Sequence, residues 1–305
     1  TVRNSNTLQY DFSKILPKAH SLNLMVGQES IVSRETLATT RIEGFPSFYD
    51  ADMAFHLSAQ GTPTRANEFY YPDDKMVSFF GRANYSFLDR YLLTATLRAD
   101  GSSKFSKGNR WGYFPSVAAG WRIIEEPWMK STQDWLSNLK LRLSFGTSGN
   151  DNIDDNMYAT SYGSGHYGIG GKDYITYVPG KTLGNKDLKW EKTETVNVGL
   201  DVSVFGSRLN VGIDWYNNTS KNLLIKNQIP SSTGYTTQYQ NVGSIRNRGV
   251  EIVINATPVR TKDFTWSTDF NVAFNRSKVL DIYGGSSESD YFIQDYESRM
   301  GFKIE

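Results

Sequence analysis

The chain has 305 residues, no cysteine and a nearly neutral charge, since 33 Lys and Arg balance 32 Asp and Glu. The lack of cysteine excludes disulfides, thiolate metal sites and thiol catalysis. The scattered basic residues form no stripe that could neutralise a phosphate backbone, so we do not expect a nucleic-acid partner. A run of about 18 apolar residues is also missing, which excludes a membrane-spanning helix.

Apolar and polar residues alternate in ten segments of the chain. In 77–87, Val77, Phe79 and Tyr85 share one face with small residues, whereas Arg82 and Asn84 lie on the other. A period of two residues is typical of a β-strand with unlike faces. In chain order, the predicted strands are 7–12, 22–28, 77–87, 91–100, 113–123, 139–147, 196–204, 209–215, 250–256 and 264–274.

The polar face of these strands is too hydrophilic for a dry core. It carries Arg82, Asn84, Arg98, Asp100, Lys140, Arg142, Asn197, Asp201, Asn210, Asp214, Glu251, Asn255, Asp269 and Asn271. Such side chains are costly in a packed interior but ordinary in a hydrated lumen. A membrane-spanning strand needs only about 9 to 11 residues, with every second one apolar. We therefore predict an all-β fold, an antiparallel transmembrane β-barrel segment whose apolar face contacts lipid.

The connections between the predicted strands alternate in length. Links at 13–20, 88–90, 206–207 and 258–263 are short, those at 31–75, 148–189 and 219–247 are long, and 101–111 and 124–137 are intermediate. Outer-membrane barrels have short periplasmic turns and longer extracellular loops, so the short links are assigned to the periplasm.

Aromatic residues near the strand ends predict two interfacial girdles. The girdle on the long-loop side is expected to contain Trp111, Tyr113, Trp190, Trp215 and Tyr216, and that on the short-turn side Tyr91, Trp121, Trp128, Trp135, Phe264 and Trp266. The alternative is that these rings fill the core of a soluble β-sandwich. The polar strand faces argue against it, because they leave no second apolar sheet to pack on.

Several apparent chemical motifs lack the context that they need. Residues 163–168 match Gly-x-Gly-x-x-Gly, but no strand precedes and no helix follows, so a flexible loop is favoured over a phosphate site. The Asn and Asp cluster at 150–156 lacks the spacing of a calcium loop and favours Asx-turns. The Glu125-Glu126 pair is interpreted as solvated turn charge. We predict no catalytic residue, no metal and no cofactor.

The most specific sequence lies in 91–122. It reads Tyr91-Leu-Leu-Thr-Ala-Thr-Leu-Arg-Ala-Asp-Gly-Ser-Ser103 and then Asn109-Arg-Trp-Gly-Tyr-Phe-Pro-Ser-Val-Ala-Ala-Gly-Trp-Arg122. These strings resemble the barrel of SusC/RagA-type TonB-dependent transporters. The segments 139–150, 188–201 and 241–251 extend the resemblance, whereas the loops 31–75 and 151–187 contribute little.

This resemblance implies an importer of the bacterial outer membrane, with a plug inside a barrel of about 22 strands. Such transporters take oligosaccharides, or peptides, from a SusD-like surface lipoprotein, while TonB acts on the plug from the periplasm. We expect residues 1–305 to be an internal part of the barrel, with the plug before Thr1 and the barrel closure after Glu305. The implied function is nutrient import without enzymatic chemistry.

Tyrosines in the long loops are the best candidates for substrate contact, because their rings can stack on sugars and their hydroxyls can bond sugar oxygens. Packing within the loop is an equally good interpretation of any one of them. The candidates are Tyr49, Tyr70, Tyr71, Tyr167, Tyr174, Tyr177, Tyr235 and Tyr239. A passive porin, an outer-membrane enzyme and a soluble carbohydrate-binding β-sandwich stay open as alternative functions.

Overall fold

The computed structural model describes residues 1–70, 72–169 and 172–281, and ten of its strands form one antiparallel sheet. These are β1 (Val2–Asp11), β2 (His20–Ser33), β5 (Asp74–Phe87), β6 (Tyr91–Ser102), β7 (Trp111–Arg122), β8 (Leu136–Asn150), β12 (Glu191–Val204), β13 (Leu209–Lys221), β16 (Ser244–Arg260) and β17 (Thr265–Asp281). Each pairs with the next of the ten along the chain. They match the ten predicted segments, of which 7–12, 113–123 and 264–274 run one residue beyond their strand, so the predicted sheet is confirmed.

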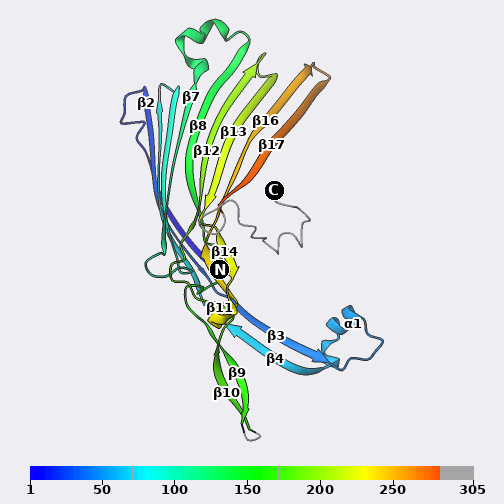
Figure 1. Cartoon of the computed structure of the whole chain (residues 1–305). Coiled ribbons are helices and arrows are strands. Elements are labelled where there is room, and N and C mark those ends of the chain that lie inside the picture. The colour runs from blue at the N-terminus through cyan, green and yellow to red at the C-terminus, as the bar shows by residue number, and fades with distance from the viewer. Residues whose placement is uncertain (71, 170–171, 282–305) are drawn as a thin grey trace.

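The strands form a long curved sheet, with turns at one end and loops at the other (Figure 1). Most are longer than their alternating segments; β16, for example, spans 17 residues, although alternation marks only 250–256. The hydrogen-bonded ladder continues past the bilayer, where the outward side chains face water and need not be apolar. Alternation therefore marks the membrane depth of a strand rather than its full length.

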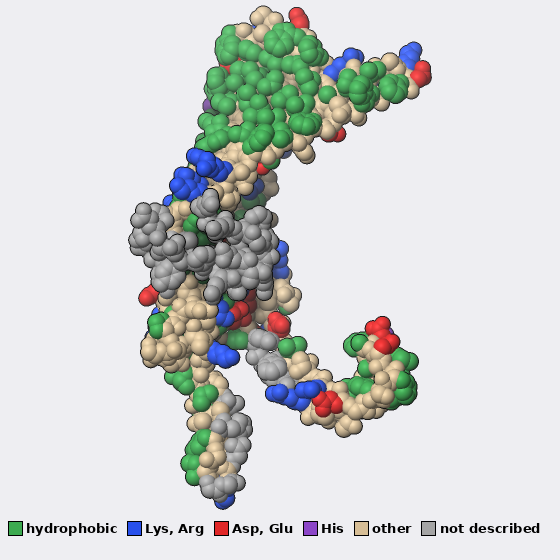
Figure 2. Space-filling view, turned by 45° about the vertical axis from the view of Figure 1, so that its right-hand side comes forward, with side chains coloured by type: hydrophobic (Ala, Val, Ile, Leu, Met, Phe, Trp, Pro, Cys, Tyr) green, Lys and Arg blue, Asp and Glu red, His purple; other side chains and the backbone are tan. Residues whose placement is uncertain are grey.

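The two faces of the sheet divide as predicted. Outward side chains at membrane depth are apolar and exposed, as at Leu97, which is 54% exposed. Figure 2 shows such side chains gathered over the part of the sheet near its turn end. An exposed apolar face of this extent is suited to lipid. None of the helices in the described ranges is long and apolar enough to cross a membrane.

The turn between β7 and β8 is longer than its neighbours because it contains a small core of its own. Two 3-10 helices, Ile123–Glu125 and Pro127–Thr132, fold over the strand ends. Ile124, Met129 and Leu136 are buried together there. The intermediate length of this connection thus reflects a packed cap at the turn end of the sheet.

The long loops carry secondary structure that alternation did not reveal. The first contains the hairpin β3 (Thr36–Glu43) and β4 (Thr62–Tyr70), with the helices α1 (Ala51–His56) and Ser58–Gln60 between them. The second contains the hairpin β9 (Tyr162–Ile169) and β10 (Lys172–Pro179). A third, three-stranded unit joins β11 (Thr182–Leu183), β14 (Leu224–Gln228) and β15 (Thr237–Asn241), with a 3-10 helix at Ser231–Thr233.

The expectation of a flexible loop at 163–168 is wrong, because these residues lie in β9 and pair with β10. Glycine weakens a strand but does not remove the backbone groups that form the ladder. In the described ranges, the match is followed by a strand, so the helix that a dinucleotide site needs is missing.

Candidate functional site

The inward face of the sheet carries a network of paired charges. The Arg142 guanidinium on β8 donates to both carboxylate oxygens of Asp201 on β12, at 2.8 and 2.9 Å, and to Asp214 on β13 at 2.9 Å. A Cβ atom at Gly199 would lie 2.7 Å from Arg142 Cζ, so a larger residue there would displace the guanidinium. One arginine therefore links three adjacent strands and balances one of the two carboxylate charges on the lumen wall.

Other inward residues are also joined across or along strands. Arg98 pairs with Asp100 at 2.8 Å and donates to the Ser78 hydroxyl at 2.9 Å. Farther along the sheet, the Asn255 amide donates to Asp269 at 2.7 Å. This wall can present polar groups to a hydrated substrate or to a protein surface within the barrel. The predicted hydrophilic face is confirmed, although its pairing required the strand register.

A buried apolar cluster anchors two loops to the inward wall. It consists of Phe105, Phe114, Ile153, Leu188 and Trp190. The Trp190 ring lies 5.5 Å from that of Phe105 and 5.4 Å from that of Phe114, and its Nε1 donates to the Arg110 carbonyl at 2.8 Å. The cluster fixes the loop 103–110 and the two ends of the second long loop, at Ile153 and at Leu188, over the loop end of β7.

For two residues, the predicted position in a girdle is wrong. Trp190 is only 5% exposed and belongs to the loop cluster. Tyr216 lies on the inward face, where its ring is close to Gly249 and its hydroxyl donates to Asn275 at 3.1 Å. Both residues lie close to strand ends. Alternate residues of a strand point to opposite faces, so being near a strand end does not by itself place a ring on the lipid face.

Two glycines make room for the Phe114 ring. A Cβ atom at Gly112 or Gly149 would overlap the ring, which is held in the loop cluster. We expect Gly149→Ala to lower the free energy of unfolding by about 1 to 3 kcal/mol through overpacking. Gly163→Ala is the matched control, since nothing lies within 4 Å of that position. Denaturant titration of the whole receptor in lipid vesicles measures both, and equal values would contradict this packing.

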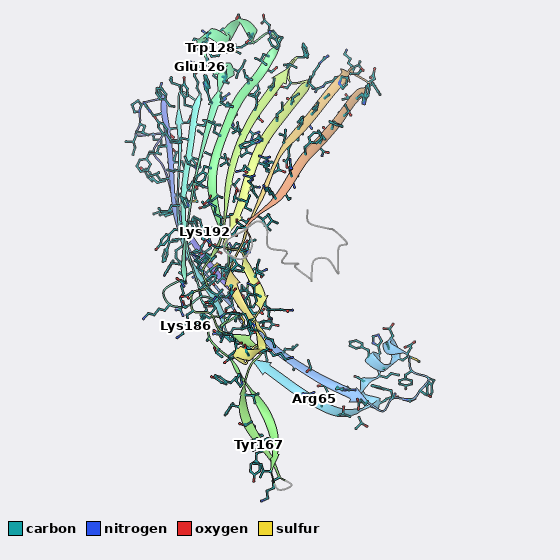
Figure 3. The ribbon with its side chains drawn as sticks, viewed as in Figure 1. Arg65, Glu126, Trp128, Tyr167, Lys186 and Lys192 are labelled. Carbon is teal, nitrogen blue, oxygen red and sulfur yellow. The ribbon has the colours of Figure 1, made fainter. Side chains whose placement is uncertain are left out.

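The candidate tyrosines whose side chains the structure describes do not gather into one site. Tyr167 and Tyr174 face each other across the β9 and β10 hairpin, with ring centroids 5.6 Å apart, and both are exposed. Figure 3 places Tyr167 near the tip of this hairpin. Tyr177 lies three positions after Tyr174, so it points to the opposite face, and it is 84% exposed.

The other candidates show more packing within the loops. Tyr49 stacks on Phe45 in the loop between β3 and β4 and donates to Gln60. Tyr239 packs against the loop cluster and donates to Asp154 at 3.0 Å. Burial, reinforced by that bond, raises the pKa of the Tyr239 hydroxyl to about 12.

Three further candidates give less information. Tyr235 is half-buried before β15. The backbone of Tyr70 pairs with Thr36 in the β3 and β4 hairpin. Tyr71 lies outside the described residues. Among the candidate tyrosines with described side chains, the Tyr167 and Tyr174 pair therefore offers the best-defined exposed ring surface.

The Asn and Asp cluster at 150–156 mainly forms local hydrogen bonds. Asn150 Oδ1 accepts from the Asn152 amide at 3.0 Å, which is the predicted Asx-turn, and Ser102 donates to Asp151 at 2.7 Å. No group of three or more His, Asp and Glu side chains in the described part of the chain is arranged to hold a metal.

The interpretation of Glu126 as solvated charge is wrong. This residue is 7% exposed, and its Oε1 accepts from the Tyr91 hydroxyl at 2.6 Å and from Trp121 Nε1 at 2.9 Å. These two bonds lower the pKa of the Glu126 carboxyl, the Tyr91 bond most. Turn composition could not reveal the contact, because its partners come from the ends of two neighbouring strands.

Comparison with known proteins places this sheet in a family. Residues 3–297 match the family described as TonB dependent receptor-like, beta-barrel. The chain belongs to this family. Its sheet is therefore part of a bacterial outer-membrane barrel, and the lipid assignment of the outward face follows.

Two curated TonB-dependent receptors and one solved structure define its relatives. SusC of Bacteroides thetaiotaomicron is 44% identical over 75% of this chain and 23% of its own length. Receptor P39 of Formosa agariphila is 40% identical over 72% of this chain and 21% of its own length. The RagAB peptide transporter structure aligns with a TM-score of 0.80 and 30% identity, covering 93% of this chain and 30% of that one. The chain thus spans about a quarter of the length of these curated receptors.

Proposed function

We propose that the receptor containing this chain imports oligosaccharides across the outer membrane, with energy supplied through TonB. The similarity to SusC, at 44% identity over 75% of the chain, carries this proposal. The inward wall supports it, since Arg142 pairs with both Asp201 and Asp214 and leaves these charged groups with little net charge. Paired charges among polar side chains suit a neutral, hydroxyl-rich substrate better than a strongly charged one.

Import of peptides by the same mechanism is the second candidate. It is supported by the RagAB peptide transporter, which has the same fold over 93% of this chain but only 30% identity. Backbone amides of a peptide would also find partners on a polar wall. Identity to SusC is higher, and for that reason we place oligosaccharides first.

The partners proposed here follow from the family. A SusD-like lipoprotein would deliver substrate at the loop end, where the β9 and β10 hairpin projects from the sheet (Figure 1). A plug domain would occupy the inward side and connect to TonB in the periplasm. In this proposal, the receptor moves its substrate unchanged and performs no enzymatic reaction.

Uptake by cells tests the proposal. A strain lacking the receptor gene is compared with the parent strain, using labelled neutral oligosaccharides and labelled oligopeptides of similar mass. We expect loss of oligosaccharide uptake alone, and the same loss when TonB is deleted. Loss of peptide uptake alone would favour the second candidate, and uptake that persists without TonB would contradict both.

The stacked tyrosines give a sharper test at residue level. In the purified receptor and lipoprotein complex, Tyr167→Ala with Tyr174→Ala should raise the Kd for the imported oligosaccharide about three- to tenfold, through loss of ring stacking. Tyr177→Ala is the matched control, because its side chain lies on the other face of the same hairpin. Calorimetric titration measures the Kd. An unchanged Kd in the double variant would remove this pair from the substrate path.

A further inference from the structure

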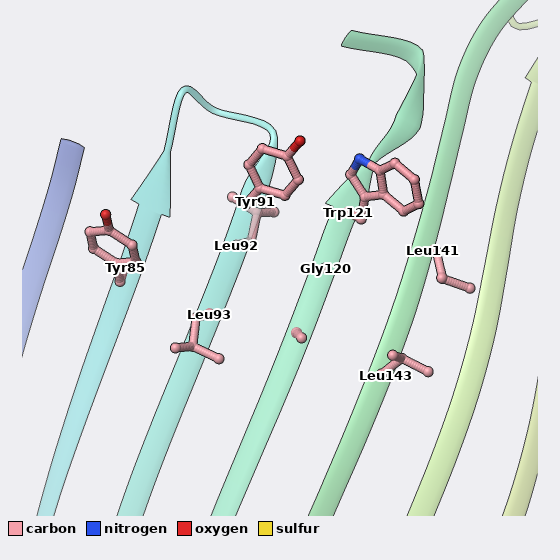
Figure 4. A pocket seen from close by; sticks show the side chains of 9 residues that line it. Tyr85, Tyr91, Leu92, Leu93, Gly120, Trp121, Leu141 and Leu143 are labelled. Carbon is pink, nitrogen blue, oxygen red and sulfur yellow. The ribbon is translucent and has the colours of Figure 1, made fainter. Parts of the chain in front are cut away.

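A shallow apolar groove opens on the lipid-facing side of the sheet, near its turn end (Figure 4). It has a volume of about 390 Å³ and crosses β6, β7 and β8. Leu93, Leu141 and Leu143 line its sides, and the small side chain of Ala119 on β7 forms its bottom. The neighbouring strands thus carry large outward residues on either side of a small one.

The turn end of the groove is capped by two rings in fixed positions. Tyr91 and Trp121 line the groove, and their hydroxyl and indole N–H groups point toward the turns. Both donate to the same oxygen of Glu126, which is almost completely buried. Ring bodies in lipid with polar atoms toward water are the arrangement of an interfacial girdle. The bonds to Glu126 hold this part of the groove in shape before any ligand arrives.

A cation lies beside this cap. Arg90 directly precedes Tyr91, and its Nη1 is 3.6 Å from the second carboxylate oxygen of Glu126. The Arg90 side chain is 27% exposed. A guanidinium has five N–H donors, and among the residues that the structure describes this long contact is its one ion pair, so donors are left for a further acceptor. Arg90 does not line the groove itself, but it adjoins Tyr91 and contacts the Glu126 that holds the two capping rings. A cation beside an apolar groove matches a ligand with a hydrocarbon chain and an anionic group.

We propose that the groove binds one phospholipid of the periplasmic leaflet. One acyl chain lies over Ala119 between the leucines, and the phosphate accepts hydrogen bonds from Arg90. The groove is continuous with the apolar outward face, and it lies at the end with the short turns, which is the periplasmic end. Lipid is therefore what covers it in the membrane. Arginine is also well suited to phosphate by charge and geometry.

Photocrosslinking tests this site in the whole receptor. The receptor is reconstituted in phosphatidylethanolamine vesicles with a trace of phosphatidylethanolamine that carries a diazirine in one acyl chain. Crosslinks are mapped by mass spectrometry. We expect the peptides that contain Leu93 and Leu143 to be labelled at least fivefold more than those that contain Ile213 and Phe270, which face outward elsewhere. Even labelling along the outward face would overturn the proposal.

Substitutions can test the site of the acyl chain separately from the contact with the phosphate. Ala119→Phe should fill the groove and lower labelling of those peptides at least fivefold, whereas Ala95→Phe, at an outward position of β6 that does not line the groove, should not. Heat-dependent gel mobility checks that both variants fold, and Ala119→Leu serves if the larger residue prevents folding. Unchanged labelling in the folded filled variant would overturn the proposal.

Arg90→Gln tests the headgroup. It should lower labelling by the phospholipid at least threefold but leave labelling by a diazirine diacylglycerol, which lacks the phosphate, unchanged. Equal loss with both probes, or no loss with either, would contradict recognition of phosphate by Arg90.

Discussion

Trp190→Ala is expected to lower the free energy of unfolding of the receptor by about 3 to 5 kcal/mol, the usual cost of truncating a buried tryptophan. The ring is 5% exposed, contacts Phe105 and Phe114, and donates to the Arg110 carbonyl. Its loss would leave a cavity and an unpaired acceptor between two loops and the wall. Denaturant titration in vesicles measures the change in free energy.

The loops should respond before the sheet does. We expect faster amide hydrogen exchange in 103–110 and 151–161 of the Trp190→Ala receptor, because the cluster that holds both loops is opened. Trp128→Ala is the control, since Trp128 is exposed in the turn at the other end of the sheet (Figure 3). Unchanged exchange in both loops would show that the cluster does not position them.

Leu97→Arg is the second substitution with a large expected effect. Leu97 faces outward on β6 between Tyr91 of the short-turn girdle and Gly101, which pairs with Trp111 of the other girdle. This places it near the middle of the bilayer, where an arginine costs about 2 to 4 kcal/mol. The same vesicle titration applies.

Asn84→Arg is the counterpart on the inward face. Asn84 accepts a hydrogen bond from Thr94 beside the lumen, where an added charge can be solvated. We expect a change of less than about 1 kcal/mol, as for a substitution at a hydrated surface. Similar losses at the two positions would reverse the facing of the sheet.

Alternation of apolar and polar residues predicts the sheet well because one face of a membrane-spanning strand contacts lipid and the other contacts water. Leu97 faces lipid and the next residue, Arg98, faces water, so the one is apolar and the other is charged. Where both faces meet water, as in β9 and the outer part of β16, the pattern fades, although the ladder continues. The loop hairpins were missed for this physical reason.

The contacts of the candidate site were harder to predict. Composition places Arg142, Asp201 and Asp214 on the inward face, but only the register of β8, β12 and β13 brings them together. Likewise, the sequence predicts Glu126 to be a solvated charge in a turn. Its hydrogen bonds become evident only when the ends of β6 and β7 place Tyr91 and Trp121 beside it. Residue type gives the environment of a side chain, whereas its partner depends on pairing between distant segments.

Cysteine scanning of β6 can show whether one strand has a lipid-facing and a lumen-facing side. The chain has no cysteine of its own, and cysteines elsewhere in the receptor are replaced first. Single cysteines at 93–98 are treated in intact outer membranes with a lipid-soluble maleimide or a charged, membrane-impermeant one. We expect positions 93, 95 and 97 to react with the first reagent and positions 94, 96 and 98 with the second. Uniform labelling by the charged reagent would contradict this facing of the strand.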